Sequence, residues 1–370
     1  MANLVFYRKY RPQTFAEIVG QEHVVQTLSN ALSQDMISHA YLFTGPRGSG
    51  KTSLARLLAK AVNCEKRKGF EPCNTCSSCT EVVRGQSLDL LEIDAASHRG
   101  IDDIRELRDG IRFSPVKSKY KVFILDEAHQ LSKDAANALL KTLEEPPAHA
   151  IFILATTEIH KMIPTIISRC QRFDFRKLTL PEIVKRLESI AKKEKANIEK
   201  PALELIALHS GGSIRDGESL LDQALTFGGM LQKEKSLTAE DIKDLLGITD
   251  TATISQFVAM LADKKGAEAV QFLNETLEKG HDPQEFAKAL VSYLRQALIV
   301  KIHPEAINPM VVGLTREQQE KLQQQAAQFT HEELHRAVSL FLEAENTMRY
   351  ASIPQLPLEL TILEILDKKE

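Results

Sequence analysis

Residues 39–53 read HAYLFTGPRGSGKTS. The apolar run at residues 40–45 is typical of a buried strand. Residues 45–52 match the pattern G-x-x-x-x-G-K-[ST], and a run with helical periodicity, TSLARLLAKAV, follows from residue 52. Glycines let backbone N–H groups close around phosphates, and the start of the helix adds positive potential. The stretch therefore predicts a phosphate-binding loop in an α/β nucleotide-binding domain.

Two side chains of this loop have distinct expected roles. Lys51 should reach the β- and γ-phosphates of a nucleotide, and the hydroxyl of Thr52 should ligate Mg²⁺. We expect the whole loop to contact ATP, that is Gly45, Pro46, Arg47, Gly48, Ser49, Gly50, Lys51, Thr52 and Ser53.

The first part of the chain alternates strand and helix patterns. Further apolar runs at residues 88–94, 121–127 and 150–157 read as buried strands, as in a parallel sheet covered on both faces. Strand signals stop after Leu178, and capping boxes at Thr179, Thr238 and Thr330 open helical segments. We predict an α/β doubly wound domain at 1–178, a small all-α domain at 179–245 and a second all-α domain at 246–370.

Acidic and hydroxyl residues end two of these strands. VFILDEAH places Asp126, expected to hold Mg²⁺ through its water shell, before Glu127, expected to polarise the attacking water. FILATTE ends in Thr156 and Thr157, which either orient the water or γ-phosphate or are simply polar strand ends.

Two arginines further along the chain each have two possible roles. Arg169, in TIISRC, is either a solvated surface residue or an arginine finger at a subunit edge. Arg215, near the start of a helix in GGSIRDGESLLDQAL, is either a γ-phosphate contact or an exposed helix residue.

Four of the five cysteines lie within sixteen residues, spaced C-x8-C-x2-C-x2-C. Four thiolates in one loop match a closed tetrahedral Zn²⁺ site, so we expect the ligands to be Cys64, Cys73, Cys76 and Cys79. Disulfides are the less favoured alternative, because the apolar run near the N-terminus, residues 4–7, is too short for a signal peptide. The metal is expected to act as a structural staple for residues 64–79, and loss of one ligand should leave nucleotide affinity nearly intact.

Composition is that of a globular protein, with 43% hydrophobic and 26% charged residues. No stretch approaches the ~20 apolar residues of a membrane span, so we expect a cytoplasmic protein without a membrane partner. Net charge is −3, but Lys and Arg outnumber Asp and Glu over residues 1–178. This balance permits contact with DNA phosphates. Arg99 and Arg105 are candidate DNA contacts.

Together these motifs resemble one family, the γ/τ subunits of the bacterial DNA polymerase III clamp loader, which are AAA+ ATPases. The resemblance rests on YRPQTFAEIVGQEHV, HAYLFTGPRGSGKTS, the cysteine loop, EIDAAS, NALLKTLEEPP, ILATTE, SRCQRF and GGSIRDGESLLDQA, which span the chain to about residue 245. Beyond that it is looser and rests mainly on LPLELTILEIL. It implies an AAA+ domain with an inserted zinc loop, a helical lid and a helical oligomerisation collar.

The resemblance also implies roles for matching residues. Lys51 and Thr52 would be the Walker A pair, and Asp126 and Glu127 the Walker B pair. Thr157 would be sensor 1, Arg215 sensor 2, and Arg169 the finger for a neighbouring subunit. Tyr10, Arg11 and Pro12 match the segment that lines the adenine pocket. Cys170, which follows the finger, is not expected to bind zinc.

The implied activity is ATP hydrolysis that opens a sliding clamp and loads it on primer-template DNA. The implied partners are δ, δ′, further γ/τ copies, the clamp and DNA, within a nucleotidyltransferase complex. Family τ chains usually continue past the collar, whereas this sequence ends at Glu370, so we do not expect the helicase- and polymerase-binding functions of that extension. Two alternatives stay open: a non-hydrolysing structural loader subunit, and another AAA+ DNA-dependent ATPase such as a helicase motor.

Overall fold

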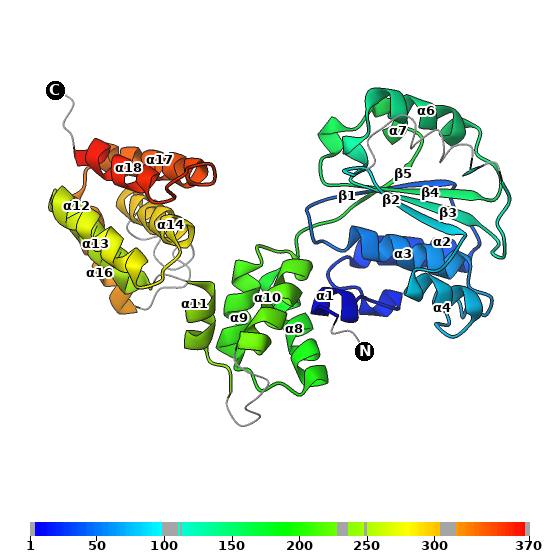
Figure 1. Cartoon of the computed structure of the whole chain (residues 1–370), viewed down its shortest axis with the longest axis horizontal. Coiled ribbons are helices and arrows are strands. Elements are labelled where there is room, and N and C mark those ends of the chain that lie inside the picture. Colours follow the sequence, from blue (N-terminus) through cyan, green and yellow to red (C-terminus); the bar gives the residue numbers. More distant parts are fainter. Residues whose placement is uncertain are drawn as a thin grey trace. The chain divides into compact units, whose positions relative to one another are not determined.

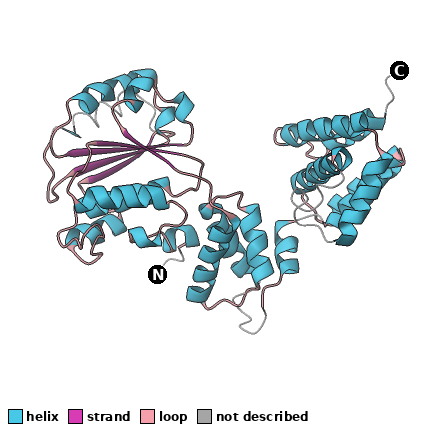
Figure 2. Cartoon of the chain, turned by 180° about the vertical axis from the view of Figure 1, so that it is seen from behind, coloured by secondary structure: helices cyan, strands magenta, loops and turns pink. Residues whose placement is uncertain are grey.

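The computed structural model describes residues 4–97, 110–111, 113–227, 236–247, 250–303 and 316–366. The chain divides into two compact units, Met1–Ala239 and Glu240–Glu370. Figure 2 shows the strands gathered in one sheet within the first unit, while the second is helical. The predicted three-domain division, with bounds at 178 and 245, stays a prediction.

A parallel sheet forms the centre of the first unit. Its strands follow the order β2-β3-β4-β1-β5 among the described residues. They are β1 (Ala40–Thr44), β2 (Leu90–Asp94), β3 (Lys121–Asp126), β4 (Ala150–Thr156) and β5 (Gln171–Asp174). β1, the strand before the phosphate loop, lies between β4 and β5, and every pairing is parallel. Four of the strands fall within the apolar runs of the sequence.

Helices cover both faces of the sheet because alternate strand residues point to opposite sides. Tyr41 and Phe43 join one hydrophobic cluster with α2 (Glu22–Ser33) and α3 (Lys51–Val62). Leu42 joins the other with α6 (Lys133–Glu144) and α7 (Pro164–Ile167). Figure 1 shows α2 and α3 on one side of the sheet and α6 and α7 on the other. Because β1 and β3 both pair in parallel with β4, their carboxyl ends lie at the same edge of the sheet. The candidate functional site lies at that edge.

Several short elements connect these layers. They are α1 (Phe6–Lys9), η1 (Phe15–Glu17), α4 (Ser77–Arg84), η2 (Ala128–Gln130) and η3 (Ile159–Lys161). β5 was not among the predicted strands. Only one of its four residues, Phe173, is buried, and within the described part of the chain β5 pairs with β1 alone. An edge strand of this composition lacks the apolar run that marks the other four.

After the sheet the first unit continues with α8 (Leu180–Glu194), α9 (Lys200–His209) and α10 (Ile214–Phe227). The capping box predicted at Thr179 is confirmed: the hydroxyl of Thr179 and the carboxylate of Glu182 each accept from the other residue's backbone N–H. α11 (Ala239–Leu246) begins at the last residue of the first unit, and the rest of it belongs to the second.

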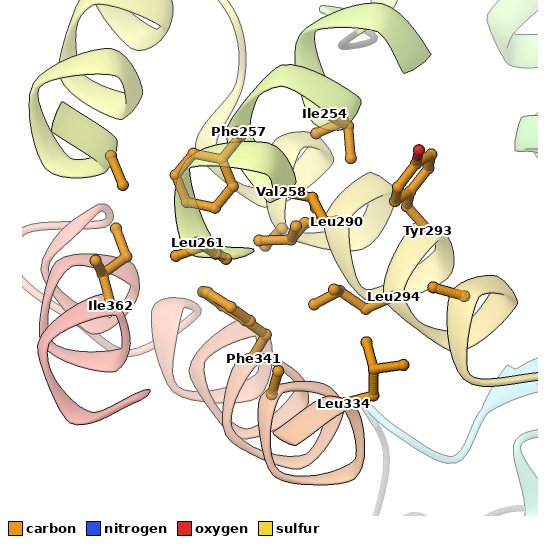
Figure 3. Close-up of a cluster of buried hydrophobic side chains, with 14 of the residues drawn as sticks. Ile254, Phe257, Val258, Leu261, Leu290, Tyr293, Leu294, Leu334, Phe341 and Ile362 are labelled. Atoms are coloured by element: carbon orange, nitrogen blue, oxygen red, sulfur yellow. The ribbon is translucent and has the colours of Figure 1, made fainter. Parts of the chain in front are cut away.

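The second unit has its own hydrophobic core. After α11, its described helices are α12 (Thr251–Ala262), α13 (Gly266–Glu278), α14 (Pro283–Ile302), α16 (Arg316–Gln328), α17 (His331–Met348) and α18 (Leu356–Leu366). Figure 3 shows Phe257, Leu261, Phe341 and Ile362 converging from three of them. The capping box predicted at Thr330 is confirmed at the start of α17. Among described residues no single helix is long and apolar enough to cross a membrane, and only α11 and α12 taken together, bent by 54°, pass that test.

Candidate functional site

The phosphate loop connects β1 to α3 in a backbone form that requires glycine. Gly45 and Gly48 have φ of 146° and 73°. A Cβ on Gly48 would lie 1.9 Å from the hydroxyl oxygen of Ser213, and one on Gly45 would lie 2.3 Å from the Phe175 carbonyl. Side chains at either position are therefore excluded by both backbone angle and space. The Gly48 carbonyl also accepts from the backbone N–H of Ile214, at the start of α10, at 3.2 Å.

Lys51 begins α3 and lies inside the loop rather than in solvent. Its Nζ donates to the carbonyls of Gly45 and Pro46, both at 2.8 Å. Burial lowers the pKa of Lys51, while Glu127 and Asp126 act in the opposite direction. A cation held this way over the loop's concave side is placed to meet phosphate oxygens.

The two residues expected to hold Mg²⁺ are adjacent in space. The Thr52 hydroxyl donates to Asp126 Oδ2 at 2.7 Å, although 74 residues separate them in the sequence. The contact exists because β1 and β3 end at the same edge of the sheet. A hydroxyl and a carboxylate oxygen are hard ligands suited to magnesium, so the donor set fits this ion.

Glu127 follows directly and has a left-handed backbone, with φ 48° and ψ 43°. Non-glycine residues seldom adopt this conformation, and such residues cluster at functional sites. Its Oε2 accepts from the Thr157 hydroxyl at 2.9 Å and lies 3.4 Å from His129 Nδ1. The same ring nitrogen shares a hydrogen bond of 2.9 Å with the Thr156 hydroxyl. Glu127 is therefore held by the end of β4.

A cavity of about 440 Å³ opens beside these groups. Its polar side includes Lys51, Thr52, Asp126 and Glu127. The other expected nucleotide contacts that line it are Arg11, Pro12, Arg47, Gly48, Ser49, Gly50, Ser53 and Arg215. Gly45, Pro46, Tyr10 and Thr157 are not among its lining residues; the first two instead accept hydrogen bonds from Lys51.

Apolar side chains from the N-terminal segment border the same cavity. Pro12, before η1, and Ile18 and Val19, after it, line the cavity. The side chain of Tyr10 turns away: its hydroxyl donates to Glu194 in α8, and its backbone carbonyl accepts from Arg186. Tyr10 thus meets the cavity's surroundings through its backbone and not through its ring.

Helices α8 and α10 close the cavity with buried charge. Arg186 and Glu218 form an ion pair of 2.9 Å whose side chains are 9% and 6% exposed, and both line the cavity. Arg215 also lines it, with its guanidinium 4.7 Å from the centre of the Tyr7 ring, a cation–π contact.

Arg169 is placed apart from this cavity, because it is not among the lining residues. It is partly exposed, pairs with Glu144 in α6 and donates to the Thr165 carbonyl at 2.8 Å. The candidate DNA contacts Arg99 and Arg105 lie outside the described residues.

The four clustered cysteines come together at the start of α4. Their sulfur atoms all lie within 4.8 Å of one another, and Sγ of Cys73 and Cys79 are 4.0 Å apart. Zn–S bonds of ~2.3 Å in a tetrahedron require sulfur pairs at about 3.8 Å, so the arrangement fits zinc. All four are free thiols, and Cys170 lies outside the cluster.

Backbone N–H groups point at these sulfurs. Those of Cys73, Cys76 and Cys79 donate to Sγ of Cys64, Cys73 and Cys76 at 3.2, 3.3 and 3.5 Å. The pKa of Cys73 is lowered to about 5, most of all by hydrogen bonding from the backbone of Thr75, whereas burial raises the pKa of Cys79. Donors aimed at sulfur favour the thiolate form that binds metal.

Sequence patterns did not indicate three residues of this site, His129, Arg186 and Glu218. His129 lies within the DEAH stretch, so its proximity to Glu127 was a readable signal. Arg186 and Glu218 lie in ordinary amphipathic helices, and only the folded chain brings them to the cavity.

The phosphate loop follows β1, and the acidic pair Asp126 and Glu127 lies at the end of β3, two strands away in the sheet. With helices closing the cavity, these features define a P-loop domain of the AAA+ class. Three family models match successive parts of the chain. They are described as DNA polymerase III, delta subunit (residues 20–179), DNA polymerase III clamp loader subunit, ATPase lid domain (182–230), and DNA polymerase III subunits gamma and tau domain III (237–369).

Individual relatives agree with these models. DNA polymerase III subunit gamma of Buchnera aphidicola is 34% identical over 98% of this chain and 98% of its own length. DNA polymerase III subunit tau of Bacillus subtilis is 43% identical over 99% of this chain, which spans 63% of that relative. The chain belongs to the DNA polymerase III gamma/tau family. Among solved structures, the RuvB branch migration motor of Thermotoga maritima aligns with a TM-score of 0.49 at 20% identity, over 68% of this chain and 78% of its own.

Proposed function

We propose that this chain is an ATP-driven motor subunit of a DNA polymerase III clamp loader. In this role it binds and hydrolyses ATP to open a ring-shaped sliding clamp and load it on primer-template DNA in the cytoplasm. One observation carries the proposal: Lys51, the Thr52–Asp126 pair and Glu127 line a single cavity in a chain of this family. A subunit that only holds the complex together needs none of these groups.

Each of these side chains has a part in the proposed hydrolysis. Lys51 exchanges its loop carbonyls for the β- and γ-phosphate oxygens. Thr52 and Asp126 hold magnesium, which when bound neutralises charge on the phosphates. Glu127 polarises the attacking water, and Thr157 sets the direction of its carboxylate.

Two arginines supply positive charge from different places. Arg215 lines the chain's own cavity and leaves the Tyr7 ring to contact the γ-phosphate. Arg169 lies outside that cavity and acts on the nucleotide of a neighbouring subunit. The neighbours are δ, δ′ and further γ/τ copies. The four-cysteine loop holds a structural Zn²⁺ with no open position for chemistry.

The test is ATPase activity of the chain, assembled with its proposed partner subunits, with and without sliding clamp and primed DNA. Turnover that rises only when both are present is the expected result. A chain that binds no ATP, or turns none over in the complete assembly, would be the structural subunit instead. Stimulation by DNA with no response to the clamp would favour another DNA-dependent ATPase such as a helicase motor.

A further inference from the structure

The loop that carries the cysteines also touches the segment that borders the nucleotide cavity. Between Cys64 and Cys73 the chain makes a tight turn, in which Lys68 and Glu71 exchange backbone hydrogen bonds of 3.2 and 3.1 Å. The turn is tied at its base, because the backbone N–H of Cys73 donates to Cys64 Sγ. It carries the side chains of Phe70 and Glu71.

Glu71 holds two consecutive backbone amides of the N-terminal segment. Its Oε2 accepts from the N–H of Phe15, and its Oε1 accepts from the N–H of Ala16, both at 3.0 Å. Each oxygen of the Glu71 carboxylate therefore accepts one hydrogen bond, from residues that precede Glu71 by 56 and 55 positions in the sequence. Hydrogen bonds to an ionised acceptor are stronger than neutral ones, so this bracket constrains η1.

Two further contacts hold the same segment. The ring of Phe70 packs edge-on against Phe15, with centroids 6.1 Å apart and planes at 74°, and Phe15 is 1% exposed. From α3, the buried Lys60 donates to the backbone and side-chain oxygens of Gln13 at 2.8 and 2.9 Å. Residues 13–16 are thus clamped between the cysteine loop and the helix that follows the phosphate loop.

The clamped residues lie between the apolar parts of the cavity wall. Pro12 precedes them, and Ile18 and Val19 follow, and all three line the cavity. The phosphate loop supplies polar groups for the triphosphate, so the flat, apolar base belongs against this wall. A shift of residues 13–16 would therefore move the base-binding wall while leaving the phosphate loop in place.

We propose that Glu71 and Phe70 are positioning residues for the base end of the nucleotide, and that the cysteine loop acts through them. The proposal rests on the proposed function in taking ATP as the ligand. It predicts a different outcome from the sequence-based expectation that loss of one cysteine ligand leaves nucleotide affinity nearly intact. The loop then contributes to the part of ATP affinity that comes from the base and not to the part that comes from the phosphates.

The test compares two probes, ATP and inorganic tripolyphosphate, each with Mg²⁺, on Glu71→Ala and on the unmodified full chain. We expect Glu71→Ala to weaken ATP binding on the order of tenfold, within the usual range of coupling between sites. Its affinity for tripolyphosphate should be unchanged. Amide hydrogen exchange at Phe15 and Ala16 should become faster in the same variant, because both donors lose their acceptor.

Glu65→Ala is the matched control. Glu65 is a carboxylate of the same loop whose contacts run to Ser77 and Ser78 and not to residues 13–16. It should leave both affinities unchanged. If Glu71→Ala does not fold, Glu71→Gln, which keeps one accepting oxygen, should show a smaller loss confined to ATP.

The outcomes separate this inference from the proposed function. An unmodified chain that fails to bind ATP overturns the proposed function. An unmodified chain that binds ATP, with a Glu71 variant that binds it equally well, overturns the inference alone. Equal loss of ATP and tripolyphosphate also overturns it, because that result means general damage to the domain.

Discussion

Glu127 combines a left-handed backbone conformation with a side chain that is held by a hydrogen bond. The left-handed backbone turns its carboxylate toward the end of β4, where Thr157 donates to it. Its neighbour Asp126 instead continues the strand and pairs with Thr52. Two adjacent carboxylates therefore have different partners, an arrangement that suits the proposed roles of Asp126 as a metal ligand and Glu127 as a general base.

This separation of roles gives a prediction for Glu127→Gln. The variant should bind ATP with Mg²⁺ about as well as the unmodified chain, because Lys51, Thr52 and Asp126 are intact. Hydrolysis should slow by roughly 10²–10⁴-fold, the usual contribution of a general base. Equilibrium binding of ATP and single-turnover hydrolysis measure the two effects separately.

Glu145→Gln is a suitable control, since Glu145 is exposed and lies at the end of α6. It should change neither quantity. Hydrolysis by Glu127→Gln at the unmodified rate would mean that another group activates the water.

At the scale of elements, the cysteine loop and the start of α4 form one unit. Cys76 is the N-cap of α4, and its sulfur accepts from the backbone N–H of Cys79 one turn later. The helix start thereby fixes two of the four thiols relative to each other. The loop itself buries few apolar side chains, so a metal is expected to contribute on the order of 10 kcal/mol to its folding.

The prediction is one tightly held Zn²⁺ per chain, bound by four sulfurs at ~2.3 Å. Elemental analysis gives the stoichiometry, and X-ray absorption gives the ligands. Cys73→Ser should abolish stoichiometric zinc, because the remaining three thiols do not close the tetrahedron. Cys170→Ser, outside the cluster, should keep the full amount. Absence of zinc in chain purified without chelators would show that the thiols are held by protein contacts alone.

The elements that sequence patterns predicted share one property, which is that their signal is local. The phosphate loop, the strand ending in Asp126 and the cysteine spacing each occupy fewer than twenty consecutive residues. β5 escaped prediction because an edge strand with one buried residue has no apolar run. Tyr10 was assigned to the cavity by resemblance, yet its ring packs toward α8, a matter of rotamer that no motif specifies.

Contacts between distant residues were equally out of reach. Arg186 meets Glu218 across 32 positions and the Tyr10 carbonyl across 176. Glu71 reaches Phe15 across 56. The sequence around each of these residues looks like that of an ordinary exposed charged residue. Their partners cannot be predicted from it, because the packing of whole helices and loops decides which residues meet.

At the scale of the whole molecule, Arg169 lies apart from the nucleotide cavity of its own chain, which bears on how copies of the chain act together. Arg169 pairs with Glu144 through side chains that are 31% and 49% exposed. An ion pair this exposed contributes about 0–1 kcal/mol, so it is easily exchanged for a stronger anion. In the proposed assembly, the γ-phosphate of a neighbouring subunit's nucleotide is such an anion, and the planar guanidinium suits it better than an ammonium does.

Arg169→Ala should therefore abolish stimulated turnover in the assembled complex while sparing ATP binding by the isolated chain. Arginine fingers supplied in trans contribute roughly 10³–10⁵ in rate. Mixing this variant with Lys51→Ala tests the arrangement directly. One variant supplies an intact phosphate loop and the other an intact finger, so shared sites should regain part of the activity, measured as ATP turnover against mixing ratio.

Arg172→Ala serves as control, because Arg172 lies three residues further on and is likewise exposed in an ion pair, with Asp174. It should keep stimulated turnover. A mixture that stays inactive although both variants assemble would count against action in trans. So would a loss of ATP affinity by isolated Arg169→Ala chain, because a finger that serves only a neighbour's nucleotide makes no contact with its own.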